Sequence, residues 1–465
     1  MNTKNNEKPV INNVESTSNL ISGRAGINTF LRYIKSVRII SIMIAMFSFI
    51  RKSKKGAPVG NIFEQILCNF ALGDSRSISY FNVLKNDEGY ASAIETNKED
   101  MVSSHTIKRF YRAIPEFCLG FFRSILRRLF VWRLSIEKPD AITINIDAMV
   151  MDNDDAAKRE GVKPTYKKVR GFAPLQMTWG RYIIDAIFRS GEKHSNHDDE
   201  TLTMIQGIVK LIREKYDPNV PIIIRMDSGF RDQKLFKAME DLEIGYIVGG
   251  VFHPDVKSFL GSLSDKDFKP HFGKKDEDIW EFFEYGDRRG TWDTYRRTIF
   301  YRPLLHEKRF LLPISRPGTI IYTNLGMGYR IDQQLKESGY DYLILPEEII
   351  RSYQKRGADE LVHRSLKDFG YEELPFDKFT ANSALYFMML IAFFLFEAFK
   401  FDVGDTVIPV TATPTTFRRK LIDIAGHFVK HSNKIILRVT ETVMRELNFK
   451  ELWARCTKAP PIAWA

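Results

Sequence analysis

The sequence predicts an α/β protein in which a mixed β-sheet is preceded by a helical region and interrupted by a mostly β insertion. Between residues 139 and 251, short β-branched runs alternate with amphipathic stretches, which is typical of an α/β core. Residues 26–138 and 329–401 instead show helical texture. The 465 residues, 44% of them hydrophobic, suffice for two or three domains with a large core.

The chain before the core is expected to be a disordered tail followed by helices. Residues 1–25 are polar and rich in Asn, so we expect the tail there. In the helical region 26–138, the segment 103–114 opens on Ser and Thr capping candidates and then places apolar side chains on one face. Its other side is basic and consists of Lys108, Arg109 and Arg112. These side chains could bind DNA phosphates, or they could be ordinary solubilising residues.

The first part of the core is predicted to span residues 139–251. Strands are expected at 141–150, 172–180, 181–191, 221–227 and 245–251, and helices at 198–216 and 231–243. The order is strand, strand, strand, helix, strand, helix, strand. That order predicts a sheet with mixed pairing.

The alternation stops at residue 252 and the helical texture returns at 329. Residues 252–328 are expected to form the β insertion, with strands at 279–285, 292–302, 307–314 and 318–323. We expect residues 329–401 to complete the core. A C-terminal, mainly helical region should follow at 402–465, including a basic helix and a short strand-like run within 415–439.

Composition limits the class of partner. The net charge of +11 and the pI of about 9.3 favour a polyanion such as nucleic acid, with a membrane surface as the alternative. The apolar runs 39–50 and 384–396 are short for a bilayer, so we expect core helices and no membrane. The three cysteines show no paired spacing, and the N-terminus is polar, which together indicate a reducing compartment such as the cytoplasm.

The stretch YQKRGADELVHRSLK (353–367) carries four functional groups on one helical stripe. At about 100° per residue, the offsets of 3, 7 and 14 residues lie roughly 60°, 20° and 40° to one side of the first position. The groups belong to Tyr353, Arg356, Glu360 and Lys367. Geometry alone favours a solvated charged face, so a functional role for the stripe depends on evidence from the rest of the chain.

Two aspartates upstream complete a possible metal site. Asp147 ends the first predicted core strand and Asp227 ends the fourth. Chemistry collects at strand ends in α/β sheets, and three carboxylates including Glu360 could hold two Mg²⁺ ions. Taken singly, each acid is more simply a turn former or an exposed helix residue. Asp152 remains an alternative to Asp147 as the first ligand.

The order and spacing of these groups resemble the bacterial insertion-sequence DDE transposases, whose catalytic fold is ribonuclease H-like. Tyr-x2-Arg-x3-Glu-x6-Lys matches the signature of one large group of them. The blocks INIDAMV, GFAPLQ, IRMDSGF and YTNL resemble further conserved segments of the family. The 133 residues from Asp227 to Glu360 suit a group that carries a β insertion there. The chain departs from the family at Met226, where Gly is common, and in a longer loop at 189–200.

The resemblance implies a DNA transposase that cuts at terminal inverted repeats and joins 3′-hydroxyl ends to target DNA. Asp147, Asp227 and Glu360 would hold two Mg²⁺ ions, with Mn²⁺ able to substitute. Further groups would contact DNA: Tyr353, Arg356 and Lys367 near the scissile bond, and Trp280 and Trp292 stacking on a flipped base. For the two tryptophans, a place in the β core is the competing interpretation.

The resemblance also implies a homodimer in the DNA complex and a location in the bacterial cytoplasm with the nucleoid. Two other functions stay open: a ribonuclease H-like nuclease without strand transfer, and an inactive transposase-derived DNA-binding protein. A zinc site is the minor alternative, because the loop before the first core helix carries His194, His197, Asp198, Asp199 and Glu200.

Overall fold

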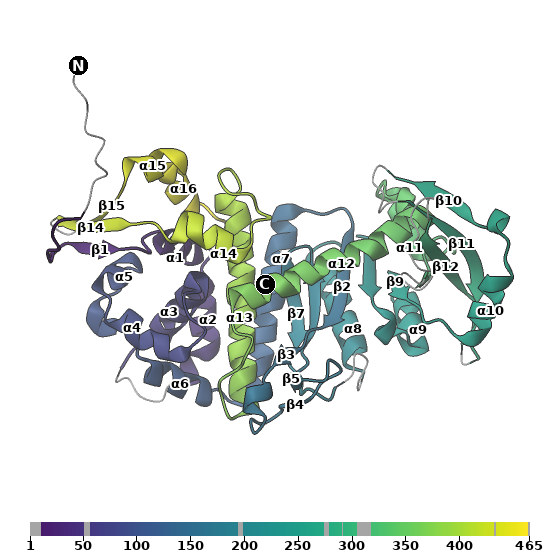
Figure 1. The fold of residues 1–465 in the computed structure, drawn as a ribbon, viewed down its shortest axis with the longest axis horizontal. Coiled ribbons are helices and arrows are strands. Elements are labelled where there is room, and N and C mark those ends of the chain that lie inside the picture. Colours follow the sequence, from purple (N-terminus) through teal and green to yellow (C-terminus); the bar gives the residue numbers. More distant parts are fainter. Residues whose placement is uncertain are drawn as a thin grey trace, which may run out of the picture.

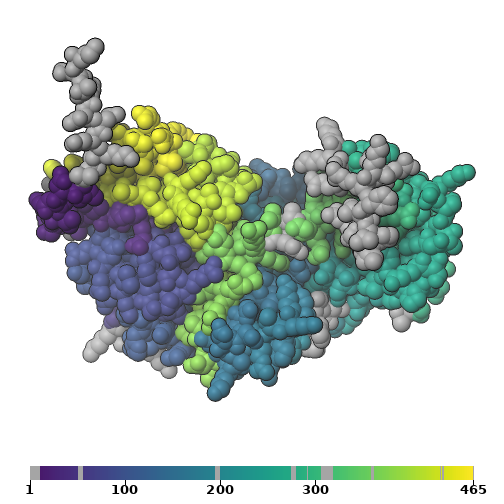
Figure 2. Space-filling model, viewed as in Figure 1, coloured from purple at the N-terminus to yellow at the C-terminus, as the bar shows by residue number. Residues whose placement is uncertain are grey.

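The computed structural model describes residues 11–50, 56–193, 199–273, 279–290, 292–304, 318–431 and 434–463, and of residues 358–360 and 430 it describes the backbone. The molecule is elongated (Figure 1). Figure 2 shows the N-terminal helices and the C-terminal region at one end and the insertion at the other. The catalytic core predicted from the sequence lies between them.

The core sheet has the mixed pairing that the sequence predicts. Its strands are β2 (Ile142–Ala148), β6 (Leu175–Trp179), β7 (Tyr182–Ile187), β8 (Ile222–Met226) and β9 (Gly245–Gly249). In space they follow the order β7-β6-β2-β8-β9. The pairs β2–β6 and β6–β7 are antiparallel, whereas β2–β8 and β8–β9 are parallel. This hairpin followed by parallel strands confirms the expected ribonuclease H-like sheet.

Helices cover this sheet because its central strands are apolar on both faces. Every residue of β8 and β9 is buried. Such strands need cover on both sides. Near one end of the core sheet, α7 (Leu119–Glu137) and α13 (Phe379–Phe399) pack against β7. Near the other, α9 (Gln233–Asp241) and α12 (Pro346–Phe369) pack against β9, while α8 (Glu200–Lys215) packs against α7 and α9.

The insertion continues the core sheet instead of forming a separate β layer. Its strands are β10 (Lys269–Phe272), β11 (Ile279–Asp287), β12 (Arg296–Pro303) and β13 (Thr319–Thr323). Each pairs antiparallel with the next, and β13 pairs antiparallel with β9, so that the described residues form one sheet of nine strands. Two helices, α10 (Pro254–Ser262) and α11 (Arg330–Glu337), flank these strands. The strand expected at 307–314 lies outside the described residues.

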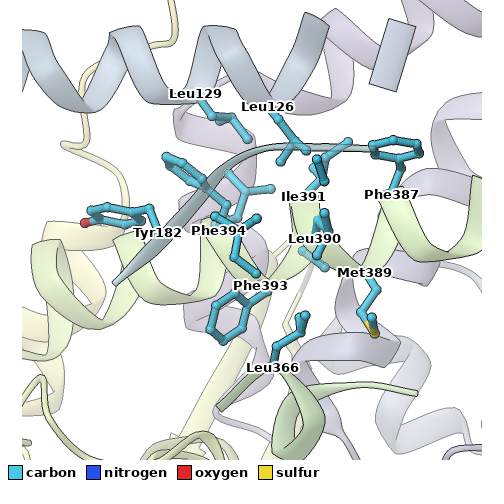
Figure 3. Close-up of a cluster of buried hydrophobic side chains, with 14 of the residues drawn as sticks. Leu126, Leu129, Tyr182, Leu366, Phe387, Met389, Leu390, Ile391, Phe393 and Phe394 are labelled. Carbon is cyan, nitrogen blue, oxygen red and sulfur yellow. The ribbon is translucent and has the colours of Figure 1, made fainter. Parts of the chain in front are cut away.

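The apolar helix α13 forms the centre of the hydrophobic core. All its residues from Ala381 to Phe399 are buried. Figure 3 shows its aromatic and aliphatic side chains meeting Leu126 and Leu129 of α7, Tyr182 of β7 and Leu366 of α12. By length and composition the segment Phe379–Gly404 could cross a membrane, but 94% of its most apolar window is buried inside the protein. It is therefore placed as a core helix.

The N-terminal region packs against the same helix. It contains α1 (Ile27–Ser36), α2 (Ile39–Phe47), α3 (Val59–Leu72), α4 (Phe81–Lys85), α5 (Glu88–Ala93) and α6 (Ser104–Arg112). Of these, α1, α3 and α6 contact α13 directly. The N-terminal helices and the catalytic core thus share one hydrophobic cluster.

The C-terminal region combines helices with a β-hairpin. After α14 (Pro414–Phe417), the hairpin β14 (Gly426–His431) and β15 (Lys434–Val439) precedes α15 (Glu441–Glu446) and α16 (Phe449–Cys456). β14 also pairs with β1 (Leu20–Ser22), which lies in the segment expected to be a disordered tail. The segment forms a strand because the hairpin offers it an unpaired edge, a partner that local sequence does not reveal.

Candidate active site

Asp147 and Asp227 lie side by side at the end of two parallel strands. The register of β2 and β8 pairs Ile142 with Ile222 and Ile146 with Met226, so the next position pairs the two aspartates. Adjacent strands lie about 4.8 Å apart, and paired residues point to the same face. Both aspartates are partly buried. The sequence folds this way because β-branched runs of equal length precede each acid.

Hydrogen bonds fix the orientation of both carboxylates. Asp147 Oδ1 accepts a hydrogen bond from Ala148 N at 2.8 Å. Asp227 Oδ1 accepts one from Gly229 N at 2.8 Å and begins a short 3-10 helix, Ser228–Phe230. The family block Asp-Ser-Gly-Phe therefore has a local structural role, because it turns the chain immediately after the carboxylate.

The helix α12 brings Arg356 to the first aspartate. Arg356 Nη1 lies 3.9 Å from Asp147 Oδ2, and both side chains are partly exposed. The guanidinium also lies over the ring of Tyr353, 5.7 Å from its centroid. The stripe predicted from the sequence thus faces the strand ends and does not form a merely solvated surface at these two positions.

Tyr353 lies against the end of β9, next to the second aspartate. A Cβ atom built on Gly249 would be 2.4 Å from Tyr353 Oη and 2.9 Å from Ser228 N. Burial raises the pKa of Tyr353, Arg356 lowers it, and the charge of Asp227 raises it further. The hydroxyl therefore stays protonated and can donate a hydrogen bond in this site.

Sequence reasoning missed His363, which lies on the same stripe. It follows Arg356 by seven residues, a spacing that places both on one helical face. Burial, together with the positive charges of Lys167, Lys367 and Arg356, lowers the pKa of His363 to about 4. The imidazole is therefore neutral at physiological pH. The seven-residue spacing was the available signal.

Lys367 lies further along α12 than the two aspartates. Eleven residues separate it from Arg356, which is about 16 Å along the helix axis. Its ammonium pairs with Glu372, at the rim of an open cleft of about 800 Å³. Lys108 also lines this cleft, together with Asp152, Asp154, Asp155 and Glu373. Arg356 and Lys367 are thus too far apart to contact the same phosphate.

The remaining predicted DNA contacts fall into two groups. On α6, Lys108, Arg109 and Arg112 are exposed opposite a buried apolar face, as the sequence pattern predicts. Trp280 and Trp292 are 1% and 5% exposed. Trp280 stacks on His271 at 4.3 Å and Trp292 packs edge-on against Phe236. The two tryptophans therefore occupy the β core, and stacking on a flipped base would require them to leave it.

The donor set at the strand ends suits a hard divalent cation. Asp147 and Asp227 offer carboxylate oxygens from one face of the sheet, which Mg²⁺ prefers. Within the side chains that the structure describes, no group of three His, Cys, Asp or Glu residues could hold a metal. The backbone of Glu360 lies one helical turn beyond Arg356 in α12, and its side chain is outside that description.

Neither alternative metal site gains support from its surroundings. Asp152 is exposed in a small sheet formed by β3 (Met151–Asp152), β5 (Arg170–Phe172) and β4 (Lys163–Pro164). Its Oδ1 accepts a hydrogen bond from Asp154 N at 2.9 Å. It therefore does not share the register of the other two aspartates. For zinc, His194, His197 and Asp198 lie outside the described residues. Asp199 pairs with Lys234 at 2.5 Å, and Glu200 lies 3.5 Å from Arg189.

A comparison with known families decides what kind of protein this is. The family described as the transposase DDE domain, group 1, matches residues 6–461. The chain belongs to this family of DDE transposases. The match includes Asp147, Asp227 and the stripe on α12, and it also covers nearly all of the N-terminal and C-terminal regions.

The chain was also compared with curated proteins and with solved structures. No curated protein matches the chain. A solved structure entitled "Cryo-EM structure of piggyBac transposase synaptic complex with hairpin DNA (SNHP)" is similar over 85% of this chain and 78% of that chain, with 12% sequence identity and a TM-score of 0.44.

Proposed function

We propose that this DDE transposase cuts DNA at the terminal inverted repeats of an insertion sequence and joins the freed 3′-hydroxyl ends to target DNA. The observation that carries the proposal is the pairing of Asp147 with Asp227 under the Arg356 stripe. Two carboxylates beside an arginine suit a phosphodiester substrate, because the acids can hold cations and the guanidinium can bind a phosphate oxygen.

Each group has a distinct task in this proposal. Asp147, Asp227 and Glu360 would hold two Mg²⁺ ions, or Mn²⁺ in their place. When bound, such ions activate the attacking oxygen and stabilise the leaving one. Arg356 binds a non-bridging oxygen of the scissile phosphate once the carboxylate of Asp147 binds a metal ion and no longer pairs with the guanidinium. Tyr353 donates a hydrogen bond to a neighbouring phosphate oxygen.

The length of α12 indicates how the DNA strand runs. The 16 Å between Arg356 and Lys367 corresponds to about five nucleotides at 3.4 Å per step along one strand. Lys367 would therefore bind a phosphate several nucleotides from the scissile bond. We infer that the strand follows the α12 stripe, with Lys108, Arg109 and Arg112 of α6 available for more distant contacts. A homodimer would hold two ends together, in the bacterial cytoplasm beside the nucleoid.

The test is cleavage and joining of a duplex that carries the element's terminal repeat, in the presence of Mg²⁺. We expect Asp227→Ala and Glu360→Ala to lower cleavage by more than about 100-fold, since a lost ligand should cost at least as much as a lost supporting group. Asp152→Asn is the matched control and should cleave as the wild type does. Full cleavage by both alanine variants would show that the site is wrongly assigned.

The same assay separates the two competing functions. A nuclease without strand transfer would yield hydrolysis products and no DNA joined to the target. A DNA-binding protein without catalysis would retain the duplex in a mobility-shift assay and cleave nothing. Chelation of Mg²⁺ should abolish cleavage by a transposase while leaving binding to the DNA largely intact.

A further inference from the structure

A basic hairpin lies beside the first aspartate, in the segment between β2 and β6. β3 (Met151–Asp152), β4 (Lys163–Pro164) and β5 (Arg170–Phe172) form a small sheet that Figure 1 shows below the core strands. The turn between β4 and β5 is tight. Lys168 N donates to Thr165 O at 3.0 Å, and Thr165 N donates to Val169 O at 2.9 Å. We call residues 165–169 the lysine hairpin.

The tip of the lysine hairpin carries a lysine where the backbone favours glycine. Lys168 has φ +64°, in the left-handed region that residues with a Cβ atom disfavour. Three-residue hairpin loops usually place glycine at such a position. A lysine kept there at a conformational cost suggests that its side chain has a use outside the fold.

Among the described residues, no carboxylate pairs with either lysine at the tip. Lys167 and Lys168 are exposed, and neither forms an ion pair with any residue in the described part of the chain. Lys167 Nζ lies over the ring of the exposed Tyr166, 5.8 Å from its centroid. The base of the hairpin adds two more exposed basic residues, Lys163 and Arg170.

The lysine hairpin lies at the proposed active site. Tyr166 Oη donates a hydrogen bond at 3.2 Å to the carbonyl oxygen of Ala148, the residue directly after Asp147. The positive charge of Lys167 also helps to lower the pKa of His363 on α12. The hydrogen bond from Tyr166 therefore holds the tip beside the end of β2, next to Asp147.

We propose that the lysine hairpin binds the phosphodiester backbone of the DNA that enters the active site. This inference rests on the proposed function, because it takes Asp147 as part of the site. Two exposed ammonium groups, an adjacent aromatic ring and a neighbouring guanidinium form a surface suited to phosphates and sugars in any sequence. The bound DNA is either the element's own end or the target.

The first experiment measures DNA binding by the Lys167→Ala/Lys168→Ala variant over a range of salt concentrations. The slope of log K against log salt is negative, and each lost phosphate contact reduces its magnitude by about 0.9, so we expect a reduction of about 1.8 for both lysines. At 0.1 M salt this is about an eightfold loss of affinity per lysine. The matched control is Lys210→Ala/Lys336→Ala, which removes two exposed lysines from α8 and α11.

Two probes distinguish the sources of the DNA. A duplex with the terminal repeat reports on the element's end, and a mixed-sequence duplex reports on target DNA. A reduced slope with one probe or with both supports the proposal, and the probe affected identifies which DNA the lysine hairpin binds. An unchanged slope with both probes would overturn it. Since binding is measured, this result differs from failure of the proposed function, in which the wild type would bind DNA but neither cleave nor join it.

Lys168→Gly separates a role in binding from a role in folding. Glycine relieves the left-handed backbone at φ +64° and removes the ammonium group. We expect an unchanged or higher melting temperature together with a salt slope whose magnitude is reduced by about 0.9. If the lysine only shaped the hairpin, DNA binding would follow stability and would not fall.

Discussion

Gly249 offers the sharpest test of how α12 is placed over the strand ends. In Gly249→Ala the new Cβ would lie 2.4 Å from Tyr353 Oη, whereas ordinary contacts begin at 3.4 Å. The tyrosine must therefore shift by about 1.0 Å, the difference of the two distances. The same Cβ would be 2.9 Å from Ser228 N, which belongs to the turn after Asp227.

The expected cost follows from that displacement. A misplacement of about 1 Å in a catalytic group lowers the rate by about 100-fold, which equals about 2.7 kcal/mol of activation free energy. Overpacking at a buried strand end should also lower the free energy of unfolding by about 1–3 kcal/mol. The assay is Mg²⁺-dependent cleavage of the end-containing duplex, with thermal unfolding measured in parallel. Gly261→Ala is the control, because nothing lies within 4 Å of its Cβ position.

A second substitution tests whether Tyr353 transmits the effect. Tyr353→Phe removes the hydroxyl that lies nearest to the new Cβ, so Gly249→Ala should cost less in that background. The new Cβ would still lie about 0.5 Å too close to Ser228 N, compared with an ordinary contact distance. The reasoning is refuted if Gly249→Ala cleaves as the wild type does. It is also refuted if the substitution costs the same with and without the hydroxyl, since the double-mutant cycle would then show no coupling.

Three further substitutions test charges and packing in the same framework. His363 has a pKa of about 4 in the folded protein against an ordinary 6.5, so between these pH values the unfolded chain binds more protons. The free energy of unfolding should therefore fall as the pH drops from 6.5 to 4, and urea unfolding should show a smaller fall in His363→Gln. Asp185 is fully buried and accepts hydrogen bonds of 2.7 to 3.1 Å from Arg123 and Arg127. Asp185→Ala should therefore lower the free energy of unfolding by about 3–5 kcal/mol, whereas Asp217→Ala, at an exposed position, should change it little. Leu390→Ala in the buried centre of α13 (Figure 3) should cost about 2–5 kcal/mol in denaturant unfolding, whereas Leu361→Ala on the exposed side of α12 should cost less than about 0.5 kcal/mol.

Local patterns were sufficient to predict the elements of the core. The β-branched runs before Asp147 and Asp227 became β2 and β8, and the amphipathic stretch with acidic residues at its start became α8. These predictions depend on alternation and capping, which act within a few residues. The relation between the two aspartates also follows, because equal strands in parallel register carry the residues that follow them to the same edge.

Contacts between distant segments were not predictable in this way. Nothing local shows that β13 pairs with β9, or that β1 completes a sheet with β14. The burial of Trp280 and Trp292 has the same origin, since their partners come from other strands and helices. The lysine hairpin was missed because its meaning depends on a contact with Ala148 rather than on its own sequence.

The antiparallel pairing of β13 with β9 explains why α12 begins away from the two aspartates. β9 runs parallel to β2 and β8, so it ends at the edge that holds the two aspartates, while β13 ends at the opposite edge. The chain leaves β13 there, and Arg297 binds the carbonyl oxygens of Leu325 and Ile344 just before α12 begins. To return to the aspartates, α12 must run back over the length of the strands.

The distances agree with this path. Tyr353 follows the first residue of α12 by seven positions, which is about 10 Å along the helix, and the four steps from Gly245 to Gly249 along β9 cover about 13 Å. Tyr353 therefore reaches the end of β9, and the next turns of α12 carry Arg356 and Glu360 past the aspartates. Because the insertion adds strands to the edge of the sheet, it changes where the chain travels without changing where the helix must arrive. An insertion of this kind can grow or shrink while the spacing from Tyr353 to Lys367 stays constant.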